Sequence, residues 1–275
     1  MIRQPSRPRV LHGLLGLLLA LVSPAVRADG EGAPLEETFE LELVYPQEKG
    51  EWQLTFAPEF SSGEGNTQRL PVVVEYGLSD LWQVGVSADA WVRVEPDGSP
   101  STDGLGDVRV EIQRTWMDVR EGLHLGLSFG VGYPLGNVED GTTEGTAEYE
   151  AAVLFARELP GARQLILIGQ LGAALVDPVD ELDDIVPGGL VDDDEEANEL
   201  EYGVGLLIPF ERLVASIEWS GSGNRWDGGD EQELYVTAGL TGALSDAWEL
   251  GVGVGAGLTD DSDDVRARVL LTTEF

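Results

Sequence analysis

The sequence predicts an all-β protein, a twelve-stranded antiparallel transmembrane β-barrel of the bacterial outer-membrane type. Apolar residues alternate with polar residues or glycine in segments of roughly 10 residues, as strands with one lipid-facing side require. The turns between these segments are alternately short and long, and the chain ends on an alternating segment closed by Phe275. The 36 glycines are spread through the apolar segments, which is typical of curved barrel strands.

The amino terminus has the pattern of a secretory signal peptide. Three arginines precede the apolar run Val10 to Val22, and Pro24 is followed by Val26-Arg27-Ala28. The run is shorter than the roughly 20 residues that a helix needs to cross a bilayer, so we expect cleavage after residues 1–28 rather than an uncleaved anchor. Residues 29–50 are predicted to be a periplasmic N-terminal segment, and residues 51–275 to be the barrel.

Period-two alternation defines the strands one after another. From Trp82 to Val94 the even positions are apolar, while Gln83, Gly85, Ser87, Asp89 and Arg93 face the other way. The same alternation recurs from Leu123 to Tyr133 and from Leu250 to Leu258. At about 3.3 Å per residue such strands are long enough to cross a tilted bilayer. The predicted strands are 51–60, 68–76, 81–94, 106–116, 122–133, 146–156, 164–176, 199–208, 212–220, 232–240, 248–259 and 265–275.

The connections separate this fold from an exported β-sandwich, which would show the same alternation. Short turns follow every second strand, and longer polar stretches lie between them at 61–67, 95–105, 134–145, 177–198, 221–231 and 260–264. Trp82 and Trp248 each follow a short turn that begins Leu-Ser-Asp, where an aromatic girdle would lie. Strands of this length also exceed the usual 5–6 residues of soluble sheets.

The last predicted strand carries a further signal. Val269, Leu271 and Phe275 lie on its apolar face, and a final strand of this kind resembles the assembly signal that the barrel-assembly machinery recognises. We therefore expect these three residues to direct assembly of the barrel.

Composition excludes several classes of function. The formal net charge of −35 makes nucleic acid a poor partner, and the absence of cysteine rules out disulfides and thiolate metal sites. His124 is the one histidine after the signal peptide, and a strand would hold it about 13 Å from Ser128, too far for a catalytic pair. We expect no enzyme activity and no cofactor.

Charged residues are predicted on the inward face. They either pair across strands and fill the lumen, or line a passage that selects solutes by charge. Twelve strands lie between the eight that side chains can fill and the sixteen of wide porins, which favours a narrow conduit. The predicted pore-lining residues are Glu75, Asp89, Arg93, Arg109, Glu111, Glu150, Glu218, Arg266 and Arg268.

The most acidic loop spans 177–199 and contains no basic residue. Such runs are usually solvated loops, and the alternative is a loose divalent-cation site at Asp192, Asp193 and Asp194, or cations shared with lipopolysaccharide. The spacing is not that of a regular calcium loop.

Four stretches of the chain carry a family resemblance: 74–86 (VEYGLSDLWQVGV), 103–109 (DGLGDVR), 132–136 (GYPLG) and 244–260 (LSDAWELGVGVGAGLTD). In their order and spacing they resemble the MetA-pathway of phenol degradation family of outer-membrane transporter proteins. The resemblance implies an outer-membrane channel or transporter for small, hydrophobic or aromatic molecules in a Gram-negative bacterium. The alternative is a non-transporting structural or surface-interaction barrel with acidic, cation-binding outer loops. In both cases the partners are outer-membrane lipid and lipopolysaccharide; transport would add a small-molecule solute.

Overall fold

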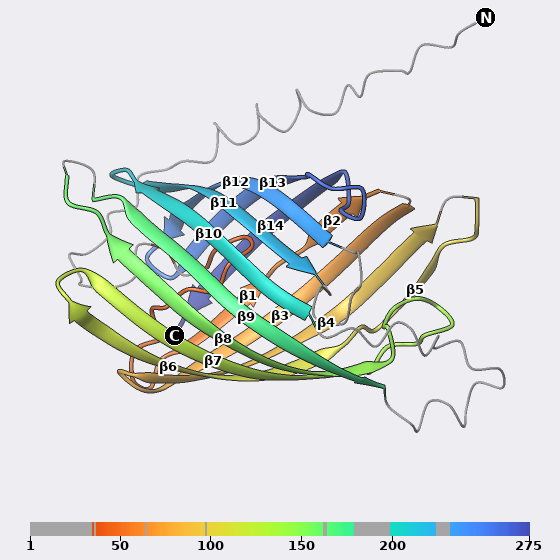
Figure 1. The fold of residues 1–275 in the computed structure, drawn as a ribbon, viewed down its shortest axis with the longest axis horizontal. Coiled ribbons are helices and arrows are strands. Elements are labelled where there is room, and N and C mark those ends of the chain that lie inside the picture. Colours follow the sequence, from red (N-terminus) through yellow and green to blue (C-terminus); the bar gives the residue numbers. More distant parts are fainter. Residues whose placement is uncertain are drawn as a thin grey trace, which may run out of the picture.

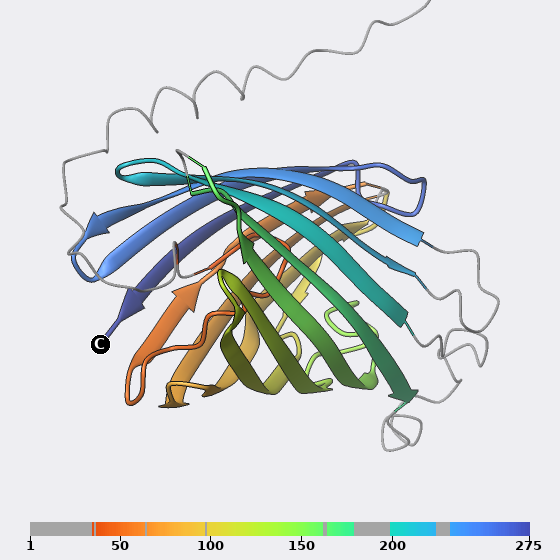
Figure 2. The same ribbon diagram turned by 60° about the vertical axis from the view of Figure 1, so that its left-hand side comes forward.

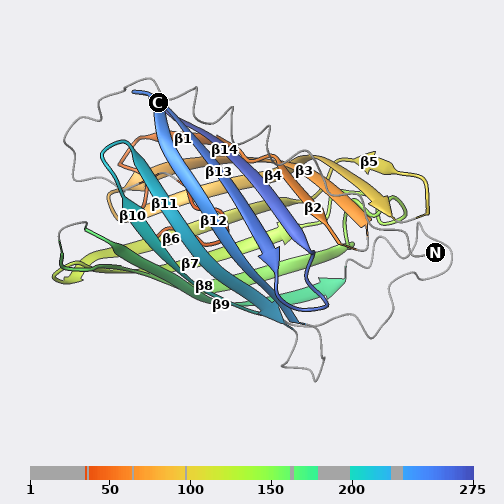
Figure 3. The same cartoon turned by 90° about the horizontal axis from the view of Figure 1, so that it is seen from above.

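Antiparallel strands close on themselves as a twelve-stranded barrel in the computed structural model (Figure 1). The structure describes residues 35, 37–63, 65–96, 98–161, 164–178, 199–223 and 232–275. From β6 to β14 each strand pairs with the next strand in the chain, and the oblique strands form a continuous wall (Figure 3). The predicted fold class is therefore confirmed. The strands are β1 (Trp52–Phe56), β2 (Glu59–Ser62), β3 (Gly65–Ser79), β4 (Trp82–Pro96), β5 (Thr102–Gly104), β6 (Val108–Arg120), β7 (Leu123–Tyr133), β8 (Thr146–Glu158), β9 (Ile166–Pro178), β10 (Glu199–Pro209), β11 (Leu213–Gly223), β12 (Gln232–Ser245), β13 (Trp248–Gly257) and β14 (Val265–Glu274).

Two of the twelve barrel strands consist of two pieces each. β1 and β2 both pair with β3 and β14, and they are separated at Ala57-Pro58. Proline has no amide hydrogen, so the ladder is interrupted there. β5 and β6 both pair with β4, on either side of residues 105–107. These pieces explain why fourteen strands build a twelve-stranded barrel.

The barrel closes where its first and last strands meet. β1 pairs with β14, and Trp52 and Phe275 exchange two backbone hydrogen bonds of 3.0 Å. The carboxyl-terminal residue is thus part of the ladder, and its side chain is exposed on the outer face. Closure leaves no open sheet edge at this seam.

The alternation fixes an outer and an inner face on every strand. On β7 the outer face carries Leu127 and Phe129, which are about half exposed, whereas His124 and Ser128 are buried inside. On β13 the inner face carries glycines. No helix in the described part of the chain is long and apolar enough to span a membrane.

The hydrophobic core lies inside the barrel rather than between sheets. Leu35 and residues 37–50, which precede β1, run within the wall of strands, as the orange-red segment in Figures 1 and 2 shows. This differs from the expected periplasmic position of the N-terminal segment. The physical reason is that the inner wall offers both apolar side chains and hydrogen-bonding groups to this segment.

Candidate functional site

The candidate site is the lumen together with the segment that occupies it. We call residues 37–48 the plug segment. It has no regular secondary structure, and Phe39 and Leu41 alternate with Glu40 and Glu42. Phe39 and Val44 are each only 1% exposed. An extended chain with exposed amides needs hydrogen-bond partners when it is buried, so its contacts with the wall decide how it is held.

Glu218 on β11 is the principal anchor of the plug segment. This carboxylate is fully buried and accepts hydrogen bonds from the backbone amides of Phe39 (3.2 Å), Glu40 (2.8 Å) and Leu41 (3.2 Å). A carboxylate with several amide donors is a favourable arrangement for a buried charge. Its partners lie 177 to 179 residues away in the chain, so this contact joins two segments that are far apart in the sequence.

The opposite wall binds the same segment through uncharged side chains. Gln113 and Thr115 on β6 donate to the carbonyl oxygens of Leu43 (3.1 Å) and Val44 (2.8 Å). The amide of Gln47 donates to Gln83 of β4 at 2.9 Å. Hydrogen bonds therefore reach the plug segment from opposite sides of the barrel, which fixes its path across the lumen.

Apolar contacts complete the fit on the side of β8 to β11. Leu41 and Val44 pack with Leu154, Ile168 and Leu207, all of which point inward and are nearly fully buried. Burial of each such side chain contributes about 1.5–3 kcal/mol. An inward apolar wall would be unfavourable in a water-filled channel, and the plug segment covers it.

Phe39 occupies a space that is bounded by glycines. A Cβ atom on Gly239 or Gly253 would lie within 2.5 Å of the Phe39 ring, and one on Gly251 would lie 3.1 Å away. Wall residues with side chains at these positions would collide with the ring. The glycines of β12 and β13 therefore make room for the plug segment.

Carboxylates gather on the polar side of the lumen. The acidic cluster comprises Glu37 and Glu42 of the plug segment with Glu75 and Glu111 of the wall. Gln53 bridges two of them, donating to Glu37 at 2.9 Å and to Glu75 at 2.8 Å. Glu37 lies outside the strands, and burial raises its pKa to about 7, opposed in part by its hydrogen bond from Thr55.

The predicted pore-lining residues divide into two groups. Glu75, Glu111 and Glu218 belong to the surroundings of the plug segment, and the guanidinium of Arg268 donates to the carbonyl of Phe39 as well as to Glu59. The others form ion pairs with acidic or basic side chains of the same strand or of another strand. These pairs are Arg109–Glu150, Asp89–Arg69 (3.4 Å), Arg93–Glu95 (2.8 Å) and Arg266–Glu233 (3.2 Å).

The remaining predicted residues have different outcomes. Val269 and Leu271 lie on β14, next to Phe275, and their role in assembly stays a prediction. Asp192, Asp193 and Asp194 lie outside the described residues. Within the described ranges, no group of three or more acidic or histidine side chains is placed to hold a metal ion.

The plug segment was not predicted, although two features of the sequence indicate it. Residues 39–43 (FELEL) alternate like a strand, and 153–156 (VLFA) and 166–168 (ILI) are apolar at consecutive positions. Consecutive apolar residues in a barrel strand place some of them inward. An apolar inner wall implies that something apolar covers it.

Comparisons with known proteins agree with the barrel. No protein-family model matches the chain, and no curated protein matches it. An outer membrane channel from Pseudomonas putida F1 is similar in structure, with a TM-score of 0.63 and 12% identity over 86% of this chain and 100% of that one. The NanC porin (TM-score 0.55, 8% identity, 80% and 98% covered) and the KdgM porin (0.52, 9%, 81% and 99%) are also similar. At these identities the likeness concerns the fold.

Proposed function

We propose that the protein is an outer-membrane channel for small molecules, and that the plug segment closes it. The observation that carries this proposal is that the lumen is occupied by a separate stretch of chain, rather than by side chains of the wall. The carboxyl end of the plug segment continues into β1. The expected removal of residues 1–28 would leave only residues 29–36 ahead of its amino end. Such a segment can withdraw while every strand pairing of the barrel stays intact.

The chemistry of the inner surface indicates which class of solute the channel would pass. Withdrawal of the plug segment would uncover Leu154, Ile168 and Leu207 on one side and the carboxylates of Glu75 and Glu111 on the other. A passage with one apolar and one acidic side favours neutral or cationic solutes with an apolar part over anions. This agrees with the hydrophobic or aromatic compounds that the family resemblance implies. The barrel fold, which the chain shares with an outer membrane channel and two porins, supports a location in the outer membrane of a Gram-negative bacterium, in contact with phospholipid and lipopolysaccharide.

A non-transporting barrel is the second candidate. The three amide hydrogen bonds to Glu218 favour this second candidate, because they suit a plug segment that stays in the lumen permanently. In that case the protein would be a closed surface or structural barrel.

Deletion of residues 37–48 separates the two candidates. The full-length protein and the deletion variant are reconstituted in planar bilayers, and a variant with a glycine-serine segment of equal length is the control. Heat-modifiable migration on a gel verifies that each barrel has folded. We expect low conductance from the parent, steady conductance from both variants, and faster liposome uptake of tryptophan than of glucose. Folded variants that do not conduct would contradict the channel.

A further inference from the structure

Arg114 is a charged residue on the outer, lipid-facing side of the barrel. It lies on β6 with Val110, Ile112 and Trp116 on the same face. The alternation of β6 leaves Arg109 and Glu111 inside, so Arg114 cannot reach the lumen pairs. A cation here costs several kcal/mol at the membrane midplane and about 0–1 kcal/mol near the interface.

Two indole rings hold its guanidinium. Cζ of Arg114 lies 4.9 Å from the ring centre of Trp82 and 4.9 Å from that of Trp116. Trp82 pairs directly with Arg114 across β4 and β6, and it follows a short turn. The guanidinium is therefore at the level of the aromatic girdle at the short-turn end, which is the periplasmic end of such barrels. Nε of Arg114 is buried and has no hydrogen-bond partner in the protein.

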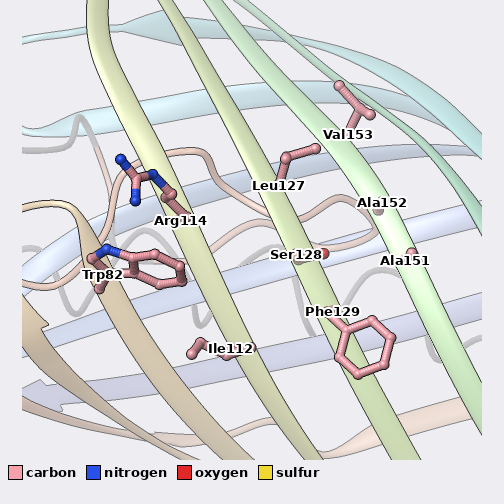
Figure 4. A pocket seen from close by; sticks show the side chains of 9 residues that line it. All are labelled: Trp82, Ile112, Arg114, Leu127, Ser128, Phe129, Ala151, Ala152 and Val153. Carbon is pink, nitrogen blue, oxygen red and sulfur yellow. The ribbon is translucent and has the colours of Figure 1, made fainter.

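An apolar depression of about 450 Å³ begins beside this guanidinium (Figure 4). Ile112, Leu127, Phe129 and Val153 project around it, and Ala151 forms part of its floor. Small side chains on β8 beside Phe129 create the hollow, since Phe129 and Ala151 are direct partners across the two strands. The depression faces outward, so an acyl chain has access to it.

We propose that Arg114 and this depression bind one phospholipid of the periplasmic leaflet, with the phosphate on Arg114 and an acyl chain along Ala151. A phosphate takes parallel hydrogen bonds from a guanidinium, and stacking between two indoles fixes the plane of the guanidinium for that contact. The apolar depression next to a cation distinguishes a lipid from free phosphate. The inference rests on the proposed membrane location and is independent of whether the barrel conducts.

Native mass spectrometry of the full-length barrel in detergent tests the site. Phosphatidylglycerol is added to the parent, to Arg114→Gln and to Ala151→Leu, which fills the depression. The matched controls are Arg120→Gln, exposed at the end of β6, and Ala215→Leu on β11, three strands away from β8. We expect retention of phosphatidylglycerol to fall about tenfold in both site variants and to stay unchanged in the controls. Arg114→Gln removes one charge-assisted hydrogen bond to the phosphate, and Ala151→Leu removes the contact with the acyl chain.

Two further additives identify the ligand. Diacylglycerol with the same chains lacks the phosphate, and inorganic phosphate lacks the chains; neither is expected to bind or to compete. Equal retention by parent and Arg114→Gln, or full competition by inorganic phosphate, would overturn the inference. Loss of lipid with unchanged conductance in Arg114→Gln would leave the proposed channel intact. A folded, lipid-binding barrel that never conducts would contradict the channel alone.

Discussion

Glu218→Ala should release the plug segment, because this side chain receives three backbone amides. A hydrogen bond to a charged acceptor contributes about 1.5–3 kcal/mol, and an amide left without a partner costs about 1–3 kcal/mol. Water can enter the space that the shortened side chain vacates, so we take about 1 kcal/mol per amide. The total of about 3 kcal/mol shifts the closed-to-open equilibrium about 100-fold.

The assay uses the absence of cysteine in the chain. A single Leu43→Cys substitution in the plug segment reports its exposure through the rate of labelling by a water-soluble maleimide, measured beside bilayer conductance. Both should rise with Glu218→Ala, and less with Glu218→Gln, which keeps one acceptor oxygen. Glu211→Ala in the exposed turn before β11 is the charge-matched control. Unchanged labelling and conductance in a folded Glu218→Ala barrel would refute the reasoning.

Three further predictions concern pH, charge and assembly. The pKa of Glu37 is about 7 in the plugged barrel, against an ordinary value of 4.5. Glu37 therefore stabilises the closed state fully below about pH 4.5, and this stabilisation is lost as the pH rises through 7. Open probability should therefore increase between pH 5 and pH 8, and a pH profile unaltered by Glu37→Gln would contradict this. The charged groups that face Glu37 are Glu75, Glu111, Glu249 and Arg268. In the variant lacking the plug segment, Arg109→Glu should raise cation over anion permeability severalfold in reversal-potential measurements, whereas Arg120→Glu should not. Polar residues appended after Phe275 should lower the yield of heat-modifiable barrel, since Phe275 pairs with Trp52 at the seam; an unchanged yield would remove its role in assembly.

The strands could be predicted because their signal is local. Alternation alone predicts that Leu127 faces outward and Ser128 inward, and both residues have these orientations in the structure. The break at Pro58 was missed because one barrel strand in two pieces gives the same alternation as an unbroken one.

Inward charges were predictable, but their partners were not. Arg109 and Glu150 lie on β6 and β8, and they meet across Gly130 of the intervening β7. That contact depends on the register of three strands and on the missing side chain of the glycine, neither of which periodicity reveals. The plug segment was missed for a related reason, since its anchor Glu218 is far away in the chain.

Closure of a conducting channel by the plug segment is tested most directly by a reversible disulfide between the plug segment and the wall. A Cβ atom on Gly253 would lie 2.7 Å from Cγ of Phe39, one bond from the Phe39 Cβ. Two introduced cysteines, Phe39→Cys and Gly253→Cys, are therefore within the reach of about 3.5–4.5 Å between Cβ atoms that a disulfide spans. Oxidation should abolish conductance, reduction should restore it, and Phe39→Cys alone should not respond. Equal conductance of the oxidised and reduced forms, with the disulfide verified by mass spectrometry, would contradict the account.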